Sequence, residues 1–347
     1  MEPKTNSRLL LIGSTQGDVH LSNYYSLIKD HFQEILIVTG NDVDFCNSIK
    51  LNFGLKNPFT VLKSVKRLKR IINEFSPTII HVHQANSYCF LTSLANRGER
   101  PQVLTVWGSD VLLLPKKGFI YKYIVKKGLR SSDKITADAQ FIEDKIEDLV
   151  GPVDFTTANF GIDLPNIIVD PSKKEKIIYS NRLHESLYNI DRIILAFIQF
   201  QKKHTDWKLI IAGSGPETDY LKELARDLPE SSYSFVGFVN SETNLNHYKK
   251  ASFFTSIPSS DGTSISLLEA MACGAAPILS NLPANHEWVK SGYNGIIVTG
   301  TLENAFEKAL KLDISEVAKL NKDIIEKKAT KESNRKIYLD VYNDLLT

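Results

Sequence analysis

Segment 259–277 of the chain, SSDGTSISLLEAMACGAAP, combines a turn, the start of a helix and two acids. A strand predicted over 253–257 leads into this turn, and the helix is predicted to begin at about Thr263 and to end before Gly274. The first backbone N–H groups of a helix lack acceptors within it, so they form a site for an anion such as phosphate. Here these groups belong to Gly262, Thr263, Ser264 and Ile265.

Two acids flank this predicted anion site. Asp261 comes just before it, and Glu269 lies about one and a half turns into the helix. A carboxylate at either position could accept hydrogen bonds from a ligand held at the helix start. The plainer interpretation makes Asp261 the N-cap and Glu269 a surface residue of the helix, and the segment alone leaves both open.

Short β-branched runs alternate with amphipathic helical stretches along the chain, a pattern typical of βαβ units and parallel sheets. The predicted strands form two series, 9–13, 35–39, 79–83, 103–106, 134–137 and 155–158, and then 176–180, 208–212, 234–238, 253–257, 277–280 and 295–298. We therefore predict an α/β protein with two doubly wound, Rossmann-like domains. Because ligands bind beyond the carboxyl ends of parallel strands, both domains are expected to face an interdomain cleft.

The predicted domain boundary lies within 164–176, where clusters of Pro, Asp and Lys interrupt the pattern. It separates an N-terminal domain over 1–165 from a C-terminal domain over 166–330. From Leu302 onward the sequence predicts helix, and the last segment, 331–347, could pack back on the first domain. Its apolar residues at helical spacing are Ile337, Val341 and Leu345.

The composition is that of a globular protein, with 347 residues, 42% hydrophobic and 24% charged. It excludes collagen-like, disordered and membrane-spanning classes. The three cysteines are too few and too scattered for a disulfide framework or a metal cage, which suggests a reducing cytosol. The apolar stretch 9–12 is too short for a signal peptide or a spanning helix. We therefore expect a cytoplasmic protein.

Positive charge is concentrated between Lys50 and Arg130, where there are 15 basic residues and three acids, although the whole chain has a net charge of +2. Two predicted amphipathic helices in this region, 59–75 and 119–129, carry Lys and Arg beside an apolar stripe. Such helices suit an anionic membrane surface. The alternative is a core-facing stripe with a solvated basic face. No recognised nucleic-acid-binding motif is present, so nucleic acid is not an expected partner.

The spacing of Asp261 and Glu269, with Ala-Met-Ala-x-Gly after the glutamate, resembles a signature of the retaining nucleotide-sugar glycosyltransferases of GT-B architecture. This is the glycosyltransferase family 4, or group 1, type, with two facing Rossmann-like domains. Five further segments resemble family motifs in the expected order, so the resemblance extends along almost the whole chain. They are His81-Val82-His83, 159–163 (NFGID), 180–183 (SNRL), 212–216 (AGSGP) and 236–239 (VGFV).

The resemblance implies a role for each matching residue. Arg182 would hold the donor diphosphate, His83 would be the active-site histidine, and Asp261 would bind the donor sugar hydroxyls; these three would be the catalytic residues. Glu269 would accept hydrogen bonds from the ribose hydroxyls. The other donor-binding residues would be Gly213, Gly237, Phe238 and the anion site of Gly262, Thr263, Ser264 and Ile265.

On the acceptor side, the residues expected to face the cleft lie at or after the ends of the first, third and fourth predicted strands. They are Gly17, Asp18, His83, Trp107 and Asp110. Trp107 could stack on a sugar, but a half-buried aromatic is the plainer interpretation. His83 ends an apolar run, so it could also be a core histidine with satisfied hydrogen bonds.

The sequence departs from the family pattern at three positions. Asp261 stands where Glu is usual, and Ser264 replaces a glycine. Tyr188 stands where alignment would place a second phosphate-binding basic residue, a lysine, which leaves Arg182 as the expected lone side-chain cation on the diphosphate. The hydroxyls of Thr263 and Ser264 could offset part of that loss by donating to phosphate oxygens.

The resemblance implies a retaining, metal-independent transfer of a hexosyl or N-acetylhexosaminyl group from a nucleotide diphospho-sugar. The acceptor would be a hydroxyl of a glycan or lipid-linked glycan, in cell-surface polysaccharide or glycolipid biosynthesis at the cytoplasmic face of a membrane. No cofactor is expected besides the nucleotide sugar itself, which is a co-substrate. Two alternatives stay open: a nucleotide-sugar epimerase or hydrolase of the same architecture, and a non-catalytic partner subunit that binds a sugar nucleotide.

Overall fold

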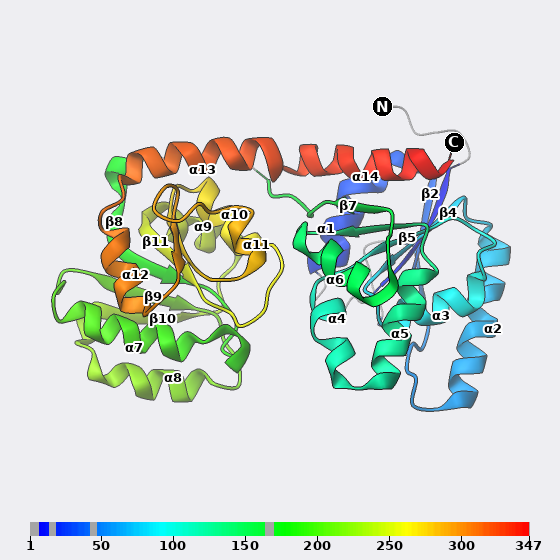
Figure 1. Ribbon diagram of the computed structural model, residues 1–347, viewed down its shortest axis with the longest axis horizontal. Helices are drawn as coiled ribbons and strands as arrows, with labels where there is room; N and C mark the ends of the chain where they lie inside the picture. Colours follow the sequence, from blue (N-terminus) through cyan, green and yellow to red (C-terminus); the bar gives the residue numbers. More distant parts are fainter. Residues whose placement is uncertain (1–6, 14–18, 42–46, 164–169, 347) are drawn as a thin grey trace. The chain divides into compact units, whose positions relative to one another are not determined.

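The computed structural model describes residues 7–13, 19–41, 47–163 and 170–346. The chain forms two compact units (Figure 1). Unit 1 comprises residues 1–161 and 331–347, and unit 2 comprises residues 162–330. The first division of the chain thus falls after Gly161, whereas the sequence analysis placed it after residue 165.

Unit 1 is built on a parallel sheet. Its strands are β1 (Arg8–Ile12), β2 (Glu34–Thr39), β3 (Ser48–Lys50), β4 (Ile79–His83), β5 (Gln102–Thr105), β6 (Lys134–Ala137) and β7 (Phe155–Thr157). They lie in the order β3-β2-β1-β4-β5-β6-β7. All six strands predicted for this half are present, each within one residue of its predicted bounds. The short edge strand β3 was not predicted, because Ser-Ile-Lys lacks a β-branched run.

The helices of unit 1 connect its strands, except for α14, which follows unit 2 in the chain. They are α1 (Val19–Ile28), α2 (Pro58–Phe75), α3 (Ser87–Asn96), α4 (Ser109–Leu112), α5 (Phe119–Arg130), α6 (Phe141–Val150) and α14 (Lys331–Leu346). The start of α2 is fixed by Asn57, whose side chain accepts the N–H of Phe59 at 2.9 Å, and by Pro58 in the first turn. The helices predicted over 59–75 and 119–129 therefore form.

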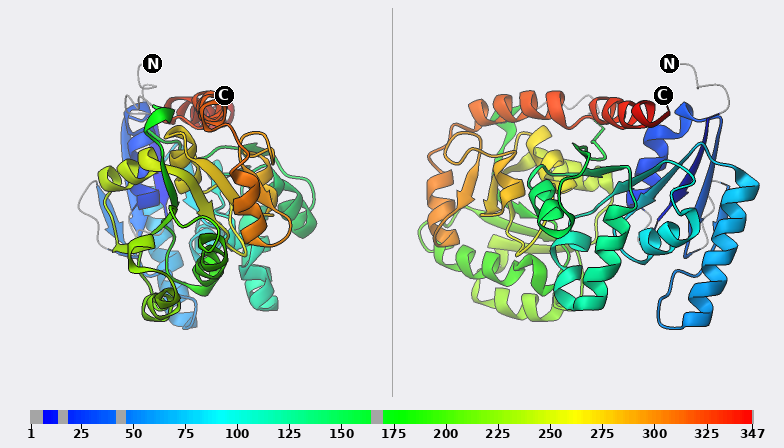
Figure 2. Two further views of the ribbon diagram at one scale, coloured as in Figure 1. Left: turned by 90° about the vertical axis from the view of Figure 1, so that its left-hand side faces the viewer. Right: turned by 45° about the vertical axis from the view of Figure 1, so that its right-hand side comes forward.

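Helix α14 completes the core of unit 1, and Figures 1 and 2 show it (red) beside α1. Tyr338 and Tyr342 of α14 are buried in one cluster with residues of β1, α1 and β4. The Tyr342 hydroxyl lies 2.6 Å from Nδ1 of His81, and Nε2 of the same ring lies 2.7 Å from the Thr105 hydroxyl. Burial lowers the pKa of His81, so its imidazole is neutral within this network.

Unit 2 repeats the architecture. Its strands are β8 (Glu175–Ser180), β9 (Lys208–Ala212), β10 (Tyr233–Gly237), β11 (Ala251–Ser256), β12 (Ala276–Ser280) and β13 (Ile296–Val298). The order β10-β9-β8-β11-β12-β13 is again that of a doubly wound sheet, and all pairings are parallel. The predicted second series of strands is therefore present.

The helices of unit 2 are α7 (Ile190–Gln201), α8 (Thr218–Leu224), α9 (Ser241–Lys250), α10 (Ile265–Ala272), α11 (Pro283–His286), α12 (Leu302–Ala309) and α13 (Ile314–Lys328). The helical structure predicted from Leu302 onward is present, divided into α12, α13 and α14. Asp313 caps α13 by accepting the N–H groups of Ser315 and Glu316, and so starts a new helix there. Among the described helices, none is long and apolar enough to cross a lipid bilayer.

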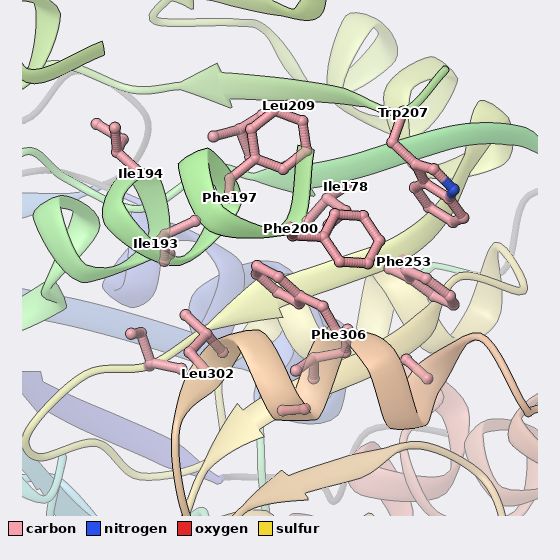
Figure 3. Packing of buried hydrophobic residues seen from close by; sticks show 14 of the residues in the cluster. Ile178, Ile193, Ile194, Phe197, Phe200, Trp207, Leu209, Phe253, Leu302 and Phe306 are labelled. Carbon is pink, nitrogen blue, oxygen red and sulfur yellow. The ribbon is translucent and has the colours of Figure 1, made fainter. Parts of the chain in front are cut away.

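Apolar clusters cover both faces of the unit 2 sheet. On one face, Phe197 and Phe200 of α7 pack with Phe306 of α12, and Trp207 stacks on Phe253 with ring centroids 4.8 Å apart (Figure 3). On the other face, α10 buries Leu267, Leu268 and Met271. This burial fixes α10 against the sheet and so holds its N-terminus at the carboxyl edge of the strands.

Where the chain enters and leaves unit 2, its two segments are neighbours. The N–H of Ile162 donates to the carbonyl of Ala329 at 2.8 Å, and Ile162 pairs with Thr330 as an isolated β-bridge. Unit 2 is therefore a continuous run of chain whose two ends meet.

Candidate functional site

Each sheet has one point where the strand order reverses, between β1 and β4 in unit 1 and between β8 and β11 in unit 2. In doubly wound sheets, ligands bind beyond the carboxyl ends of the strands at such a point. In unit 2, Arg182 follows β8 and Asp261 follows β11. The topology alone therefore brings these two sequence-predicted residues to one place.

The guanidinium of Arg182 is held by three side chains. Its Nη2 lies 2.7 Å from Oδ2 of Asp261, and its Nη1 donates to the hydroxyl of Ser264. Its Cζ lies 4.6 Å from the ring centroid of Tyr188, within the range of a cation–π contact. The Arg182 side chain is 11% exposed and that of Asp261 is 25% exposed. Arg182 is therefore pre-oriented, with part of its surface open to a ligand.

Tyr188 helps to orient Arg182 in this arrangement. It ends the 3-10 turn Ser186–Tyr188, after which Asn189 takes the left-handed conformation with φ of 52°. This turn places the aromatic ring against the Arg182 guanidinium. The sequence analysis treated Tyr188 only as the loss of a second cation, whereas in the structure it helps to hold the remaining one.

Gly213, at the end of β9, packs against the backbone of the Arg182 loop. A Cβ at this position would lie 2.4 Å from the Arg182 carbonyl oxygen, and the φ of 111° disfavours any side chain. The Gly213 N–H donates to the carbonyl of Gly237 at 2.8 Å. Gly213 therefore connects the ends of β8, β9 and β10, and positions the Arg182 loop.

We expect Gly213→Ala to weaken nucleotide binding about tenfold and to lower the free energy of unfolding by about 1–3 kcal/mol, because the methyl group must displace the Arg182 backbone. Calorimetric titration with a nucleoside diphosphate and urea unfolding measure the two effects. Gly300→Ala is the matched control, since a Cβ there meets nothing within 4 Å. Equal nucleotide affinity of both variants and the unaltered protein would contradict this role of Gly213.

The helix start at the carboxyl edge differs from the prediction in detail. Helix α10 begins at Ile265, two residues after the predicted Thr263, and Asp261 is not its N-cap. The Gly262 N–H donates to the Asp261 carboxylate at 3.1 Å, and the Thr263 hydroxyl accepts from Nε1 of Trp288 at 3.0 Å. Within the described residues, the N–H groups of Ser264 and Ile265 have no acceptor. Of the four N–H groups predicted for the anion site, the structure therefore leaves those of Ser264 and Ile265.

Glu269 lies on the second turn of α10 within a polar network. Its Oε2 accepts from Nδ2 of Asn244 at 3.3 Å, and Oδ1 of Asn244 accepts from the Tyr179 hydroxyl at 2.7 Å. Burial raises the pKa of Glu269 to about 7. Asp261 also has a raised pKa because it is buried, although the neighbouring Arg182 opposes the shift. A ligand that donates hydrogen bonds to these two carboxyls would therefore stabilise their ionised forms.

Two buried polar atoms at the end of β8 have no hydrogen-bond partner among the described residues. They are the Ser180 hydroxyl oxygen and Oδ1 of Asn181. Both immediately precede Arg182 in the chain, at the carboxyl edge of the sheet. Buried polar atoms are usually hydrogen-bonded, so these two fit a place where a polar ligand or water supplies the partner.

In unit 1, His83 and Trp107 meet at the carboxyl edge. The Trp107 indole N–H donates to Nδ1 of His83 at 3.2 Å. Because an indole N–H can only donate, the neutral imidazole carries its proton on Nε2. His83 is fully buried, stacked on His81 and beside Tyr24, whereas Trp107 is half-buried. The interpretations of His83 as a core residue and of Trp107 as a half-buried aromatic therefore both match these surroundings.

Asp110 organises the two loops around this pair. Its Oδ2 accepts the N–H of Ala85 at 2.6 Å, and its Oδ1 accepts the N–H of Trp107 at 3.0 Å. Burial raises the pKa of Asp110 to about 6, although these backbone donors oppose the shift. Asp110 therefore acts on Trp107 through the backbone. The other two acceptor-side candidates, Gly17 and Asp18, lie outside the described residues.

Family models match both units. Residues 163–331 match glycosyl transferases group 1, and residues 8–139 match glycosyl transferase 4-like. The chain is a glycosyltransferase, with the group 1 model over unit 2 and the 4-like model over unit 1. The family that the Asp261–Glu269 signature indicated is thereby confirmed, and so is the assignment as a glycosyltransferase.

Curated relatives of this glycosyltransferase include enzymes named for lipids. Alpha-monoglucosyldiacylglycerol synthase of Streptococcus pneumoniae is 26% identical over 195 residues, 52% of this chain and 44% of that protein. The chain thus matches less than half the length of that relative. An uncharacterised glycosyltransferase of Methanocaldococcus jannaschii is 24% identical over 85% of this chain and 83% of its own length. Phosphatidyl-myo-inositol mannosyltransferase of Mycolicibacterium smegmatis is 26% identical over 67% of this chain and 61% of its own.

Solved structures share the fold along nearly the whole chain. HepE of Anabaena, in complex with UDP and glucose, has a TM-score of 0.78 at 15% identity and covers 97% of this chain and 99% of its own. Sucrose-phosphate synthase of Thermosynechococcus elongatus has a TM-score of 0.80 at 15% identity, with coverage of 98% and 99%. The predicted GT-B fold class, with two Rossmann-like units, is therefore confirmed.

Three of the sequence-predicted donor-binding residues of the glycosyltransferase are in contact with one another. Arg182, Asp261 and Ser264 are in direct contact. Phe238 follows β10 and is 82% exposed, so its ring is open to solvent at the same edge of the sheet. Sequence reasoning missed Asn244 and Tyr248, which lie near Glu269, because polar residues on the polar helix α9 carry no distinguishing pattern.

Proposed function

We propose that unit 2 binds a nucleotide diphospho-sugar as the donor, with the diphosphate on Arg182. The observation that supports this most directly is the placement of Arg182 between Tyr188, Asp261 and Ser264, beside the N–H groups of Ser264 and Ile265. A guanidinium fork and free helix N–H groups are both suited to phosphate oxygens. The Ser264 hydroxyl accepts from Arg182, which leaves its own proton available to donate to the diphosphate.

The two acids then have separate roles on one donor. Asp261 accepts hydrogen bonds from the sugar hydroxyls, and Glu269, about one turn along α10 from Ile265, accepts from the ribose hydroxyls. Gly237 and the exposed Phe238 ring contact the base at the end of β10. The Ser180 and Asn181 oxygen atoms, which have no partner among the described residues, add polar contacts near the diphosphate.

The transfer we propose proceeds with retention of the anomeric configuration and without a metal ion. As the glycosidic bond breaks, negative charge grows on the leaving diphosphate and positive charge on the sugar ring. Arg182 and the α10 N–H groups stabilise the negative charge on the diphosphate, and the Asp261 carboxylate lies beside the positive charge on the sugar ring. The diphosphate shares the Arg182 guanidinium with Asp261, so the ion pair at 2.7 Å becomes part of the donor site.

The acceptor we propose is a hydroxyl of a glycan or lipid-linked glycan, placed against the Trp107 indole that His83 and Asp110 hold in position. Two relatives are named for glucosyl- and mannosyl-transfer to lipids, which favours a lipid-linked acceptor. We further propose that α2 and α5 contact an anionic membrane surface at its cytoplasmic face. Their exposed Lys and Arg side chains would each add about 1 kcal/mol near such a surface.

A thermal-shift screen against nucleoside diphosphates and nucleotide diphospho-sugars tests the donor proposal, because a ligand of the folded state raises the melting temperature. We expect one nucleotide series to stabilise the protein, with activity retained in EDTA and an anomer of unchanged configuration in the NMR spectrum of the product. Radiolabelled donor incubated without acceptor is the control. An epimerised or hydrolysed sugar there, with no transfer when acceptors are added, would contradict the proposal.

Binding of a nucleotide diphospho-sugar is expected to strengthen as pH rises through about 7 and to level off above it. The reason is that the ribose hydroxyls prefer the ionised form of Glu269, whose pKa is raised to about 7 in the free protein. Below this pH, affinity should fall by up to about tenfold per pH unit. Calorimetry between pH 5.5 and pH 8.5 measures the profile, and Glu269→Gln should flatten it; an unchanged profile in that variant would refute the role.

A further inference from the structure

A groove in unit 1 lies over α3 and between α2 and α5, in the order that Figure 1 shows. Its volume is about 1090 Å³. Phe90 and Leu94 of α3 form its floor, Val61 and Val65 of α2 form one wall, and Ile120 and Tyr123 of α5 form the other. The groove is thus an apolar channel on the surface, large enough for a flexible hydrocarbon chain.

One end of this groove is basic. Arg97, Lys127 and Arg130 line it together with one acid, Asp133, whose Oδ2 already accepts the N–H of Gln102 at 2.8 Å. None of the three basic side chains has a carboxylate within salt-bridge distance among the described residues. The groove therefore offers an apolar channel and cations without an ionic partner in a single site.

The surface around the groove carries large apolar side chains in water. Phe59 at the start of α2 is 85% exposed and Phe119 at the start of α5 is 84% exposed. Every residue from Lys116 to Tyr123 is exposed, and this run, KKGFIYKY, combines Phe, Ile and Tyr with three lysines. Exposed apolar patches with a polar rim mark interaction sites, and aromatic rings beside lysines suit the interface of a bilayer.

We propose that this groove binds one acyl chain of an anionic phospholipid, with the lipid phosphate on Arg97, Lys127 and Arg130. The proposal rests on the membrane association proposed above and names the ligand that would hold the enzyme there. Charge complementarity favours this occupant, because a neutral chain would leave the three cations without a partner. Each methylene group buried in the groove is removed from water, so binding strengthens with the length of chain that the groove holds.

Calorimetric titration with dioctanoyl phosphatidylglycerol below its micelle concentration tests the groove in isolation from a bilayer. We expect saturable binding with one lipid per chain, at least tenfold tighter than dioctanoyl phosphatidylcholine. Leu94→Trp fills the floor and Ile120→Asp places a carboxylate in the wall, so each should weaken binding at least tenfold. Leu195→Trp, at an exposed leucine of unit 2, is the matched control and should bind like the unaltered protein.

Equal binding of the two lipids, unaltered binding by both groove variants, or equal competition by inorganic phosphate would overturn the groove as a lipid site. Sedimentation with phosphatidylglycerol vesicles separates this result from the wider proposal. Vesicle binding without binding of the soluble lipid overturns the groove and leaves membrane association standing. Loss of soluble-lipid binding and of vesicle binding overturns the groove and membrane association alike. Neither result alters the donor proposal, because nucleotide titration of the same samples tests donor binding separately.

Discussion

Replacing Arg182 with alanine should weaken the binding of a nucleoside diphosphate by about 30- to 150-fold, which corresponds to about 2–3 kcal/mol. Arg182 is the side-chain cation at the switch point of the unit 2 sheet, and its guanidinium is already oriented by Tyr188, Asp261 and Ser264. A fixed guanidinium loses little conformational entropy when the diphosphate binds. Isothermal titration calorimetry measures the affinity directly.

Two variants serve as controls for Arg182→Ala. Arg192→Ala removes an exposed arginine of α7 and should leave the affinity unchanged. Tyr188→Leu keeps the charge but removes the ring under it, so it should weaken binding less, by about fivefold, since a cation–π contact contributes about 1 kcal/mol. An Arg182→Ala affinity close to that of the unaltered protein would show that the diphosphate binds elsewhere.

Replacing Asp261 with asparagine should lower kcat by about a hundredfold or more, the cost typical of losing one group that stabilises transition-state charge. Asparagine keeps the shape but provides no negative charge beside the sugar as its positive charge develops. The affinity for a nucleoside diphosphate should not fall, because Arg182 no longer shares its guanidinium with a carboxylate. The expected signature is therefore a loss of turnover with nucleotide binding preserved.

Steady-state kinetics with the cognate nucleotide sugar, together with calorimetry, separate these two effects. Asp219→Asn, at an exposed aspartate of α8, is the matched control and should retain full activity. If Asp261→Asn lost nucleotide affinity in proportion to its turnover, Asp261 would be acting through Arg182 and not on the sugar. Unchanged turnover would remove it from the reaction altogether.

The sheets could be predicted from sequence because parallel strands covered on both faces are continuous apolar, β-branched runs. Strand β4, Ile-Ile-His-Val-His, was predicted to the residue. Its two histidines are fully buried, yet each has polar or aromatic neighbours that come from distant segments. Nothing near His81 in the sequence indicates that Tyr342 of α14 lies 2.6 Å away. Local pattern predicts strands, but it does not predict which distant side chain completes a polar network.

In the candidate donor site, too, the sequence predicts some residues but not the contacts that position them. Arg182 and Asp261 could be named from a motif, and the strand order explains why they meet. The contact of Tyr188 with Arg182 and the close approach of Gly213 to its carbonyl oxygen depend on loop geometry. The start of α10 also shifted by two residues, because Asp261 bonds to Gly262 and Arg182 and does not cap the helix.

The division of the chain, with α14 returning to unit 1, sets an order of events during synthesis. Unit 2 is a continuous run, so all its residues have been translated before those of α14. The apolar side chains of β1 and β4 that α14 covers must wait while about 170 further residues are added, which takes roughly 10–30 s at typical ribosome speeds. The unit that is translated first thus completes its core last, and the side chains that α14 covers stay without that cover until the end of the chain is made.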